Sequence, residues 1–275
     1  MSEASAVGAI TIADALRDAT SALATAGCDT PRLDAELLLA SVLEAGRERL
    51  VVDAHVPLDA EVLSRFDALV ARRVAREPVA YILGYKDFRR IRLRVDRRVL
   101  IPRPETELLV EVGLSLPPGA RVVDVGTGSG SVALALKDER PDLVVVGTDV
   151  SADALVVARE NASRLGLDVE FVLADLLDGV DGPFDAVLAN LPYVAEAVEL
   201  DPEIAVYEPA CAVFSGPDGL DLVRRLLPMV SEVPLVALEV GLPEWVASLA
   251  RDAGFGSVSI LDDLAGRERV VVARP

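Results

Sequence analysis

The sequence has 275 residues, 52% of them hydrophobic, and a formal net charge of −18. This length is enough for one large domain and a small accessory domain, and charged residues, proline or glycine interrupt every apolar run before it could span a membrane. So acidic a surface repels a phosphate backbone on average, which disfavours non-specific binding of nucleic acid.

Residues 1–16 lack the basic n-region of a secretory signal. Cys28 and Cys211 form neither a disulfide framework nor a metal-ligand pattern, and we expect both to be buried or half-buried apolar residues. These features predict a soluble cytoplasmic protein with reduced thiols, no metal site and no membrane association.

The first part of the chain, residues 9–80, has the pattern of a small helical bundle. Thr11 and Asp14 resemble a capping box at the start of one helix, and residues 31–50 and 58–76 carry apolar side chains at helical spacing. We therefore predict an N-terminal helical domain at 1–84, a β-hairpin connector at 85–104 and a larger domain at 105–275.

The predicted connector has strand-like alternation and many basic residues. Phe88, Ile91, Leu93 and Val95 alternate in part with arginine, which fits strands with one wet face. Two interpretations of the basic residues stay open: a solvated face, or a docking strip for a partner that itself touches RNA. The residues concerned are Arg72, Arg73, Arg76, Lys86, Arg89, Arg90, Arg92, Arg94, Arg97 and Arg98.

From residue 105 onward the chain alternates predicted strands with other segments. The strands are predicted at 122–125, 144–148, 169–173, 186–189, 235–240, 257–261 and 270–273, with helical stretches separating the first five. This order predicts an α/β fold with a mainly parallel sheet and helices on both faces. The connection before the last strand is too short for a parallel crossover, so we expect that strand to be antiparallel.

A glycine-rich loop follows the first of these strands and precedes a predicted helix. It contains Gly126, Thr127, Gly128, Ser129 and Gly130. Glycines allow close approach of a ligand, and the helix N-terminus offers free N–H groups to an anionic group. The loop therefore predicts a nucleotide-type cofactor, although a tight turn without ligand would have the same pattern.

Two acids lie at the ends of the next strands. Asp149 follows the glycines by about 20 residues, where a carboxylate can bind the hydroxyls of a ribose, and this suits NAD, FAD or S-adenosylmethionine (SAM) equally. Asp175 could accept from the exocyclic amine of adenine while Leu176 packs on the ring, or it could be an exposed turn acid.

The segment Asn190, Leu191, Pro192 and Tyr193 follows the fourth strand and indicates the chemistry. The nitrogen of a planar amide or aryl amine is a poor nucleophile. An asparagine oxygen and a backbone carbonyl beside proline can accept its two N–H groups and point it at an electrophile, while an aromatic ring supports the flat group. We predict that Asn190, Pro192 and Tyr193 are catalytic, that all four residues bind substrate, and that Asn190 also contacts the cofactor. The single histidine, His55, lies far away in the helical region, which disfavours a dehydrogenase.

Several further motifs together resemble one family, the release-factor glutamine methyltransferases (PrmC/HemK). Besides the glycine loop, Asp149 and the Asn-x-Pro-Tyr segment, they are the runs at 77–84 (EPVAYILG), 99–111 (VLIPRPETELLVE), 207–210 (YEPA), 218–220 (DGL), 238–241 (LEVG) and 265–269 (AGRER). The similarity covers most of the chain. One departure is Leu191, which stands where the family has proline; the backbone carbonyl survives that change.

The resemblance implies the class I SAM-dependent methyltransferase fold, a Rossmann-like sheet of seven strands with the last one antiparallel. It also implies SAM as methyl donor, S-adenosylhomocysteine as second product, and the glutamine of a Gly-Gly-Gln loop in peptide chain release factors as substrate. The helical N-terminal region resembles the substrate-docking domain of that family. Direct contact with nucleic acid is not expected.

Two other functions stay open at this point. Asn-Leu-Pro-Tyr also resembles the motif of adenine-N6 methyltransferases that act on rRNA or DNA. A non-catalytic module that binds SAM or a nucleotide and scaffolds translation factors is the third.

Overall fold

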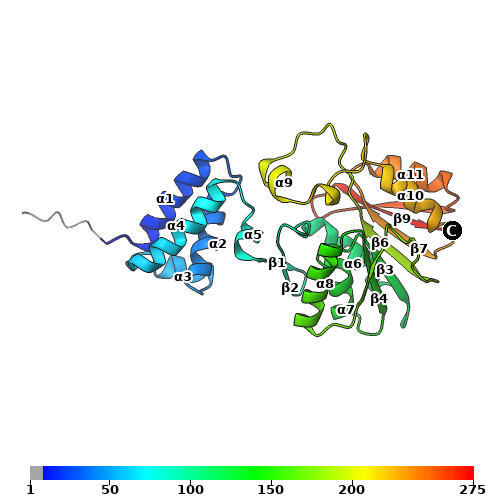
Figure 1. The fold of residues 1–275 in the computed structure, drawn as a ribbon, viewed down its shortest axis with the longest axis horizontal. Helices are drawn as coiled ribbons and strands as arrows, with labels where there is room; N and C mark the ends of the chain where they lie inside the picture. Colours follow the sequence, from blue (N-terminus) through cyan, green and yellow to red (C-terminus); the bar gives the residue numbers. More distant parts are fainter. Residues whose placement is uncertain (1–8) are drawn as a thin grey trace, which may run out of the picture. The chain divides into compact units, whose positions relative to one another are not determined.

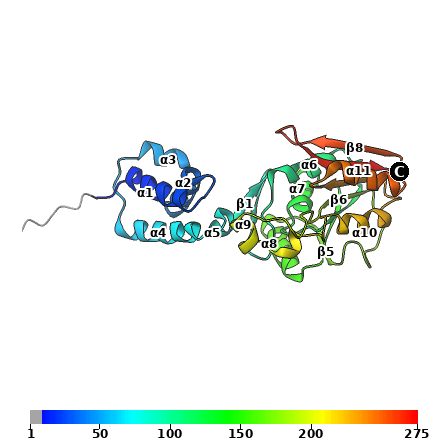
Figure 2. The ribbon, with the colours of Figure 1, turned by 90° about the horizontal axis from the view of Figure 1, so that it is seen from above.

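The computed structural model describes residues 9–275, and the chain divides after Gly84 into two compact units (Figures 1 and 2). The prediction that no secretory signal is present concerns residues 1–16. Of these, residues 1–8 lie outside the described residues. Within residues 9–275, no helix combines the length and the apolar character needed to cross a bilayer.

The first unit consists of short helices: α1 (Ile12–Thr25), α2 (Pro31–Val42), α3 (Arg47–Val52), α4 (Ala60–Val74) and α5 (Val79–Leu83). The predicted capping box is present, because the Asp14 N–H donates to the Thr11 hydroxyl and the Thr11 N–H donates to the Asp14 carboxylate. The predicted helical stretch at 31–50 is interrupted: α2 ends before Glu44, whose φ of 51° is left-handed.

A buried ion pair fixes two helices of this unit. The Arg73 Nε donates to Asp34 Oδ2 at 2.7 Å, and both side chains are buried. Arg72 is paired with Glu77. Two of the arginines from the possible docking strip are therefore engaged in internal contacts of the unit.

The second unit is built on a mixed sheet of the order β5-β4-β3-β6-β7-β9-β8. The strands are β3 (Arg121–Val125), β4 (Val144–Asp149), β5 (Glu170–Leu173), β6 (Ala186–Asn190), β7 (Leu235–Glu239), β8 (Ser257–Asp262) and β9 (Glu268–Arg274). Strands β3 to β7 pair in parallel, and β9 is antiparallel to both β7 and β8. The predictions of a seven-stranded α/β sheet and of a reversed last strand are confirmed.

Helices cover both faces of this sheet. They are α6 (Glu107–Leu114), α7 (Ser131–Glu139), α8 (Ala152–Leu165), α10 (Asp221–Met229) and α11 (Pro243–Asp252). The short helix α9 (Pro202–Tyr207), which buries no residue, and the 3-10 turns η1 (Pro104–Thr106) and η2 (Ala210–Ala212) lie in the connections. Successive side chains of a strand point to opposite faces. Val122 accordingly joins the core under α6 to α8, whereas Val123 joins the core under α10 and α11. Figure 1 shows these two groups of helices on opposite faces of the sheet.

One sequence prediction about this unit is wrong. No helix lies between β5 and β6; residues 174–185 form turns and irregular chain. Gly179 has a φ of 73°, and Pro183 has no N–H to donate to a helical hydrogen bond. The connection is too short and too interrupted for a helix, so the end of β5 opens directly to the loops beside it.

The predicted hairpin is formed by β1 (Tyr85–Phe88) and β2 (Ile91–Arg94), which pair antiparallel. Phe88, Ile91 and Leu93 are buried in the core of the second unit. The arginines on the other face are paired within the unit: Arg89 with Glu111 and Glu139, Arg92 with Asp87, Arg94 with Glu160, and Arg98 with Asp96. This internal pairing favours a solvated structural face over a free basic strip.

Candidate active site

The glycine loop lies between the end of β3 and the start of α7, at the carboxyl edge of the sheet. Gly126, Gly128 and Gly130 have φ angles of 75°, 56° and 82°. Their left-handed conformations let the loop turn sharply, and the N–H groups of Gly126 and Thr127 both donate to the Thr148 carbonyl at 2.8 Å. Gly130 serves packing, because a Cβ there would lie 2.8 Å from Leu134.

A buried acid that was not among the predicted site residues supports this loop from below. Asp124 Oδ2 accepts from the Thr127 hydroxyl at 2.6 Å and from the Ala133 N–H at 3.2 Å. Burial raises the pKa of Asp124 to about 6. Its sequence signal was an acid at an otherwise apolar position of a buried strand. Ser129 is held from the other side, since its carbonyl accepts from the buried Asn161 amide at 3.0 Å.

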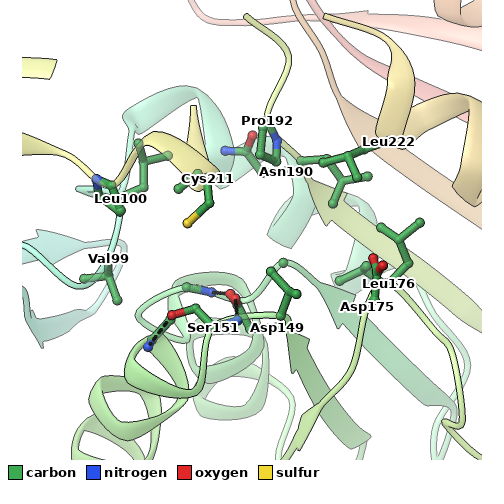
Figure 3. A pocket seen from close by; sticks show the side chains of 18 of the residues that line it. Val99, Leu100, Asp149, Ser151, Asp175, Leu176, Asn190, Pro192, Cys211 and Leu222 are labelled. Carbon is green, nitrogen blue, oxygen red and sulfur yellow. Dashed lines mark hydrogen bonds between the residues drawn. The ribbon is translucent and has the colours of Figure 1, made fainter. Parts of the chain in front are cut away.

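Asp149 ends β4 and faces the same cavity (Figure 3). Its two oxygens accept from the N–H groups of Gly128, at 2.9 Å, and Ser151, at 2.8 Å. Burial raises the pKa of this carboxyl, and the backbone hydrogen bonds oppose that effect. A carboxylate offers about four acceptor positions, so Asp149 can still accept from a diol while it holds the loop.

Asp175 and Leu176 line the cavity next to Asp149 (Figure 3). Asp175 is half exposed, and its Oδ2 accepts from Arg225 Nη2 at 2.7 Å. Leu176 is buried, with its carbonyl accepting from the Thr148 hydroxyl at 3.0 Å. The predicted adenine side of the site therefore consists of an apolar wall and a carboxylate that already has a partner.

The prediction that Cys211 is a buried or half-buried apolar residue is wrong. Cys28 is buried, but Cys211 is exposed and its side chain points into the cavity (Figure 3). The reason is local: Cys211 lies in η2, a turn at the rim of the cavity that exposes its side chains. Among residues 9–275, no cluster of three His, Cys, Asp or Glu side chains is arranged to hold a metal ion.

Asn190, at the end of β6, lies across the cavity from Asp149 (Figure 3). Its Nδ2 donates to the Thr106 hydroxyl oxygen at 2.9 Å. The Thr106 hydroxyl also faces the carboxylate of Glu239, and this contact lowers the pKa of Glu239. Thr106 and Glu239 are both buried and were not among the predicted site residues, although each lies within a motif that carries the family resemblance.

Tyr193 lies beside Asn190 on an adjoining pocket, together with Leu191, Pro192 and Arg103. Two glycines fix its position. A Cβ at Gly219 would lie 2.2 Å from the Tyr193 carbonyl oxygen, and a Cβ at Gly241 would lie 2.9 Å from the ring. Any larger residue would displace Tyr193, which explains why both motifs carry glycine at these places.

The wall of this second pocket is held by one ion pair. Arg103 Nη2 donates to both carboxylate oxygens of Glu208, at 2.7 and 2.9 Å. Burial raises the pKa of Glu208, and the guanidinium of Arg103 opposes that shift. Leu191 is also buried here, and its Cδ2 would touch a Cβ at Gly126 at 3.3 Å. Leucine thus fills the space between the glycine loop and the Asn190 segment.

Most predicted site residues gather around one cavity. Gly126, Gly128, Asp149, Asp175, Leu176, Asn190, Leu191 and Pro192 line it. Thr127 and Ser129 line an adjacent hollow that also contains Asn190, and Tyr193 lies on the far side of Asn190. Asn190 therefore lines both the cavity beside Asp149 and the pocket at Tyr193, as do Leu100, Leu191, Pro192 and Ala212.

Comparisons with known proteins identify the family of the chain. Residues 14–84 match the model of the PrmC N-terminal domain, and residues 104–206 match that of the methyltransferase small domain. The release factor glutamine methyltransferase of Cereibacter sphaeroides is 42% identical over 95% of this chain and 98% of its own length. The chain belongs to the release factor glutamine methyltransferase family.

A second relative and a solved structure are similar to this chain over most of its length. The release factor glutamine methyltransferase of Mycolicibacterium smegmatis is 39% identical over 94% of this chain and 96% of its own length. A methyltransferase structure from Pyrococcus furiosus, 18% identical, covers 77% of this chain and 98% of its own with a TM-score of 0.51, which concerns the fold alone. These relatives are named glutamine methyltransferases and the chain carries a methyltransferase domain, so the protein is an enzyme of this class.

Proposed function

We propose that this protein transfers a methyl group from SAM to the side-chain amide nitrogen of the glutamine in the Gly-Gly-Gln loop of peptide chain release factors. The observation that carries the proposal is the position of Asn190, which faces the cavity beside Asp149 on one side and the pocket at Tyr193 on the other. A methyl donor and a flat amide could meet at this residue.

The chemistry of the cavity suits SAM. The Asp149 carboxylate can accept from the two ribose hydroxyls, and Leu176 with Leu222 forms an apolar wall for a flat ring. Asp175 can accept from the exocyclic amine, and the loop at 126–130 lies under the remainder. When bound, SAM supplies a methyl carbon on a positively charged sulfur.

The residues beside this cavity activate the substrate by orientation. Asn190 Oδ1 accepts one N–H of the glutamine amide, and the Leu191 carbonyl accepts the other. Both acceptors direct the nitrogen lone pair at the methyl carbon and favour the positive charge that develops as the N–C bond forms and the C–S bond breaks. The methylated amide then loses a proton to water, so the chain needs no dedicated base.

The two other segments of the chain complete this proposal. The helical unit at 1–84 is the docking domain for the release factor, and the hairpin connector at 85–104 leads into the methyltransferase domain at 105–275. The arrangement implies action on translation termination factors in the cytoplasm, without direct contact to nucleic acid. A net charge of −18 favours a protein substrate over rRNA.

The proposal is tested by incubating the full chain with SAM and either a release factor or rRNA, followed by mass spectrometry. We expect one methyl group on the glutamine of the Gly-Gly-Gln loop, none on a release factor with alanine at that position, and none on rRNA. Asn190→Ala should lower turnover at least a hundredfold while the Kd for SAM changes less, because orientation of the nucleophile is lost. Methylated adenine in the rRNA, or wild-type turnover in a folded Asn190→Ala protein, contradicts it.

A further inference from the structure

Three polar side chains from distant parts of the chain form a line that ends at Asn190. Thr106 closes the turn η1 before α6, Asn190 ends β6 and Glu239 ends β7. Asn190 and Glu239 are direct neighbours in the parallel register of these two strands. Thr106 and Glu239 are each 2% exposed, so neither side chain can exchange its partners for water.

The polarity of this line is determined by the carboxylate. An ionised carboxylate only accepts hydrogen bonds, and a hydroxyl has a single proton to donate. The Thr106 proton goes to Glu239. The Thr106 oxygen is then left as an acceptor, and it receives the Nδ2 of Asn190 at 2.9 Å.

This polarity matters because the two ends of an asparagine amide are chemically opposite. With Nδ2 held by Thr106, the Oδ1 end of Asn190 is the one that remains for the substrate. The substrate nitrogen carries two N–H donors, so it needs acceptors. If the Asn190 amide were flipped, its Nδ2 N–H donors would face the N–H donors of the substrate amide.

We propose that Glu239, acting through Thr106, is a positioning residue that keeps the Oδ1 of Asn190 turned toward the substrate amide. The inference rests on the proposed function and deepens it. Thr106 lines the hollow beside the glycine loop, and its effect on the substrate, like that of Glu239, passes through the amide of Asn190. The buried Glu239 Oε2 has no hydrogen-bond partner within residues 9–275, and the hydroxyl of Thr106 is the polar group that faces this carboxylate and lowers its pKa.

The charge on Glu239 depends on several neighbours. Burial is the largest effect and raises the pKa of Glu239 to about 7; Glu105 raises it further, while the hydrogen bond from Thr106 and the guanidinium groups of Arg269 and Arg103 lower it. Tyr193 also faces this group. Protonated Glu239 can donate to Thr106, which frees the Thr106 proton for Asn190 and allows the amide to flip.

The direction of the pH effect follows from this order of events. An acid with a pKa near 7 is ionised above that pH and about nine-tenths protonated one unit below it. Turnover at saturating SAM and substrate should therefore fall as the pH drops from 8 to 6. Asp124, whose pKa is about 6, lies under the glycine loop on the cofactor side, so saturating SAM separates its effect from that of Glu239.

The experiment compares Glu239→Gln, Thr106→Val and Thr106→Ser in the full chain, with kcat for release-factor methylation measured from pH 6 to pH 8.5 and the Kd for SAM measured by calorimetry. Glutamine keeps the shape of Glu239 but can donate to Thr106. We expect Glu239→Gln and Thr106→Val to lower kcat at pH 8 about tenfold to a hundredfold, with the Kd for SAM changed less than threefold. Thr106→Ser keeps the hydroxyl and should retain kcat within about threefold.

The pH profile distinguishes positioning from a purely structural role. Glu239→Gln should lose the decrease in kcat between pH 8 and pH 6. Glu105→Gln should keep the wild-type kcat at pH 8.5 and move the decrease to lower pH, because it removes a negative charge that raises the pKa of Glu239.

Failure of the inference differs from failure of the proposed function. If wild-type protein methylates the release factor but Glu239→Gln has the wild-type kcat and the same decrease toward pH 6, the positioning role is overturned while the function stands. If the wild type methylates no release factor, the proposed function is overturned. Should Thr106→Val fail to fold, Glu239→Gln and Thr106→Ser still give the answer.

Discussion

The two sides of the active cavity are built in different ways. On the side of β3 and β4, the glycine loop is held by both backbone and side chains. The N–H groups of Gly126 and Thr127 donate to the Thr148 carbonyl, while the side chains of Asp149, Asp124 and Asn161 also bond to the loop. On the side of β6 and β7, Asn190 is held by the side chain of Thr106, which is held by that of Glu239. The first side is formed by nearby segments with characteristic local conformations, and the second by side chains from three distant segments. We therefore expect the backbone hydrogen bonds to support the glycine loop when one of its side-chain contacts is lost, whereas the Asn190 amide is held by a side chain.

The largest expected effect in this comparison comes from Asp149, which both holds the glycine loop and faces the cavity. Asp149→Ala removes both the proposed ribose acceptor and the acceptor for the Gly128 N–H. Hydrogen bonds to a charged group are worth about 1.5–3 kcal/mol each, so we expect the Kd for SAM to weaken on the order of a hundredfold. Titration calorimetry measures it. If the Kd for SAM is unchanged and kcat is largely lost, Asp149 acts on the substrate rather than on SAM, which contradicts the prediction.

A smaller effect is expected on the substrate side from Gly241→Ala. The added Cβ would lie 2.9 Å from the Tyr193 ring and push it away from the pocket. We expect kcat/KM for the release factor to fall about tenfold, since a displaced contact misorients the nucleophile, with the Kd for SAM unchanged. Gly182→Ala is the matched control, because a Cβ there meets nothing closer than 3.8 Å. Equal kinetics in the two variants would show that Tyr193 does not need its present position.

Glu239 should also affect stability, with a defined sign. Its folded-state pKa of about 7 lies above the ordinary pKa of 4.5 for a glutamate, so its contribution to stability is present below pH 4.5 and is lost as the pH rises through 7. In urea unfolding, Glu239→Gln should therefore be more stable than wild type at pH 8, with a free energy of unfolding higher by about 1–3 kcal/mol. At pH 5 the two proteins should have nearly the same free energy of unfolding. A variant that is more stable yet less active would show that this carboxylate is maintained for function. Lower stability at pH 8 would contradict the sign.

The smallest effect is expected from the second acid of the cofactor side. Asp175 is half exposed and paired with Arg225, and solvent weakens the contribution of such a group. Asp175→Ala should weaken the Kd for SAM only about threefold. The same calorimetric titration used for Asp149→Ala gives the ratio of the two effects. A loss as large as that of Asp149→Ala would mean that an adenine amine is held mainly by this carboxylate.

The same contrast explains what the sequence predicted. The sheet, its reversed last strand and the hairpin were predicted correctly, because apolar periodicity and short connections constrain them locally. The glycine loop and the Asn190 segment were visible as contiguous motifs. Thr106 and Glu239 were not identified as site residues, since their relation to Asn190 exists only through the pairing of β6 with β7 and the position of η1.

Two errors have the same origin. The missing helix between β5 and β6 was predicted from the general alternation of an α/β chain, but Gly179 and Pro183 interrupt that short connection. Cys211 was judged from its residue type, whereas its exposure depends on a turn at the cavity rim. In both places the deciding factor is the path of the backbone in a loop, which composition and periodicity do not describe.

The reversal of β9 has a practical consequence for work with this protein. Val270 pairs with Glu239 at the end of β7 beside Asn190, and Ala273 pairs with Val236 near the opposite end of β7. Residue 275 therefore emerges at the edge of the sheet away from Asn190. A fluorophore or affinity handle attached there would leave the approach to the cavity clear, so the protein can be immobilised through that residue while methyl transfer is followed.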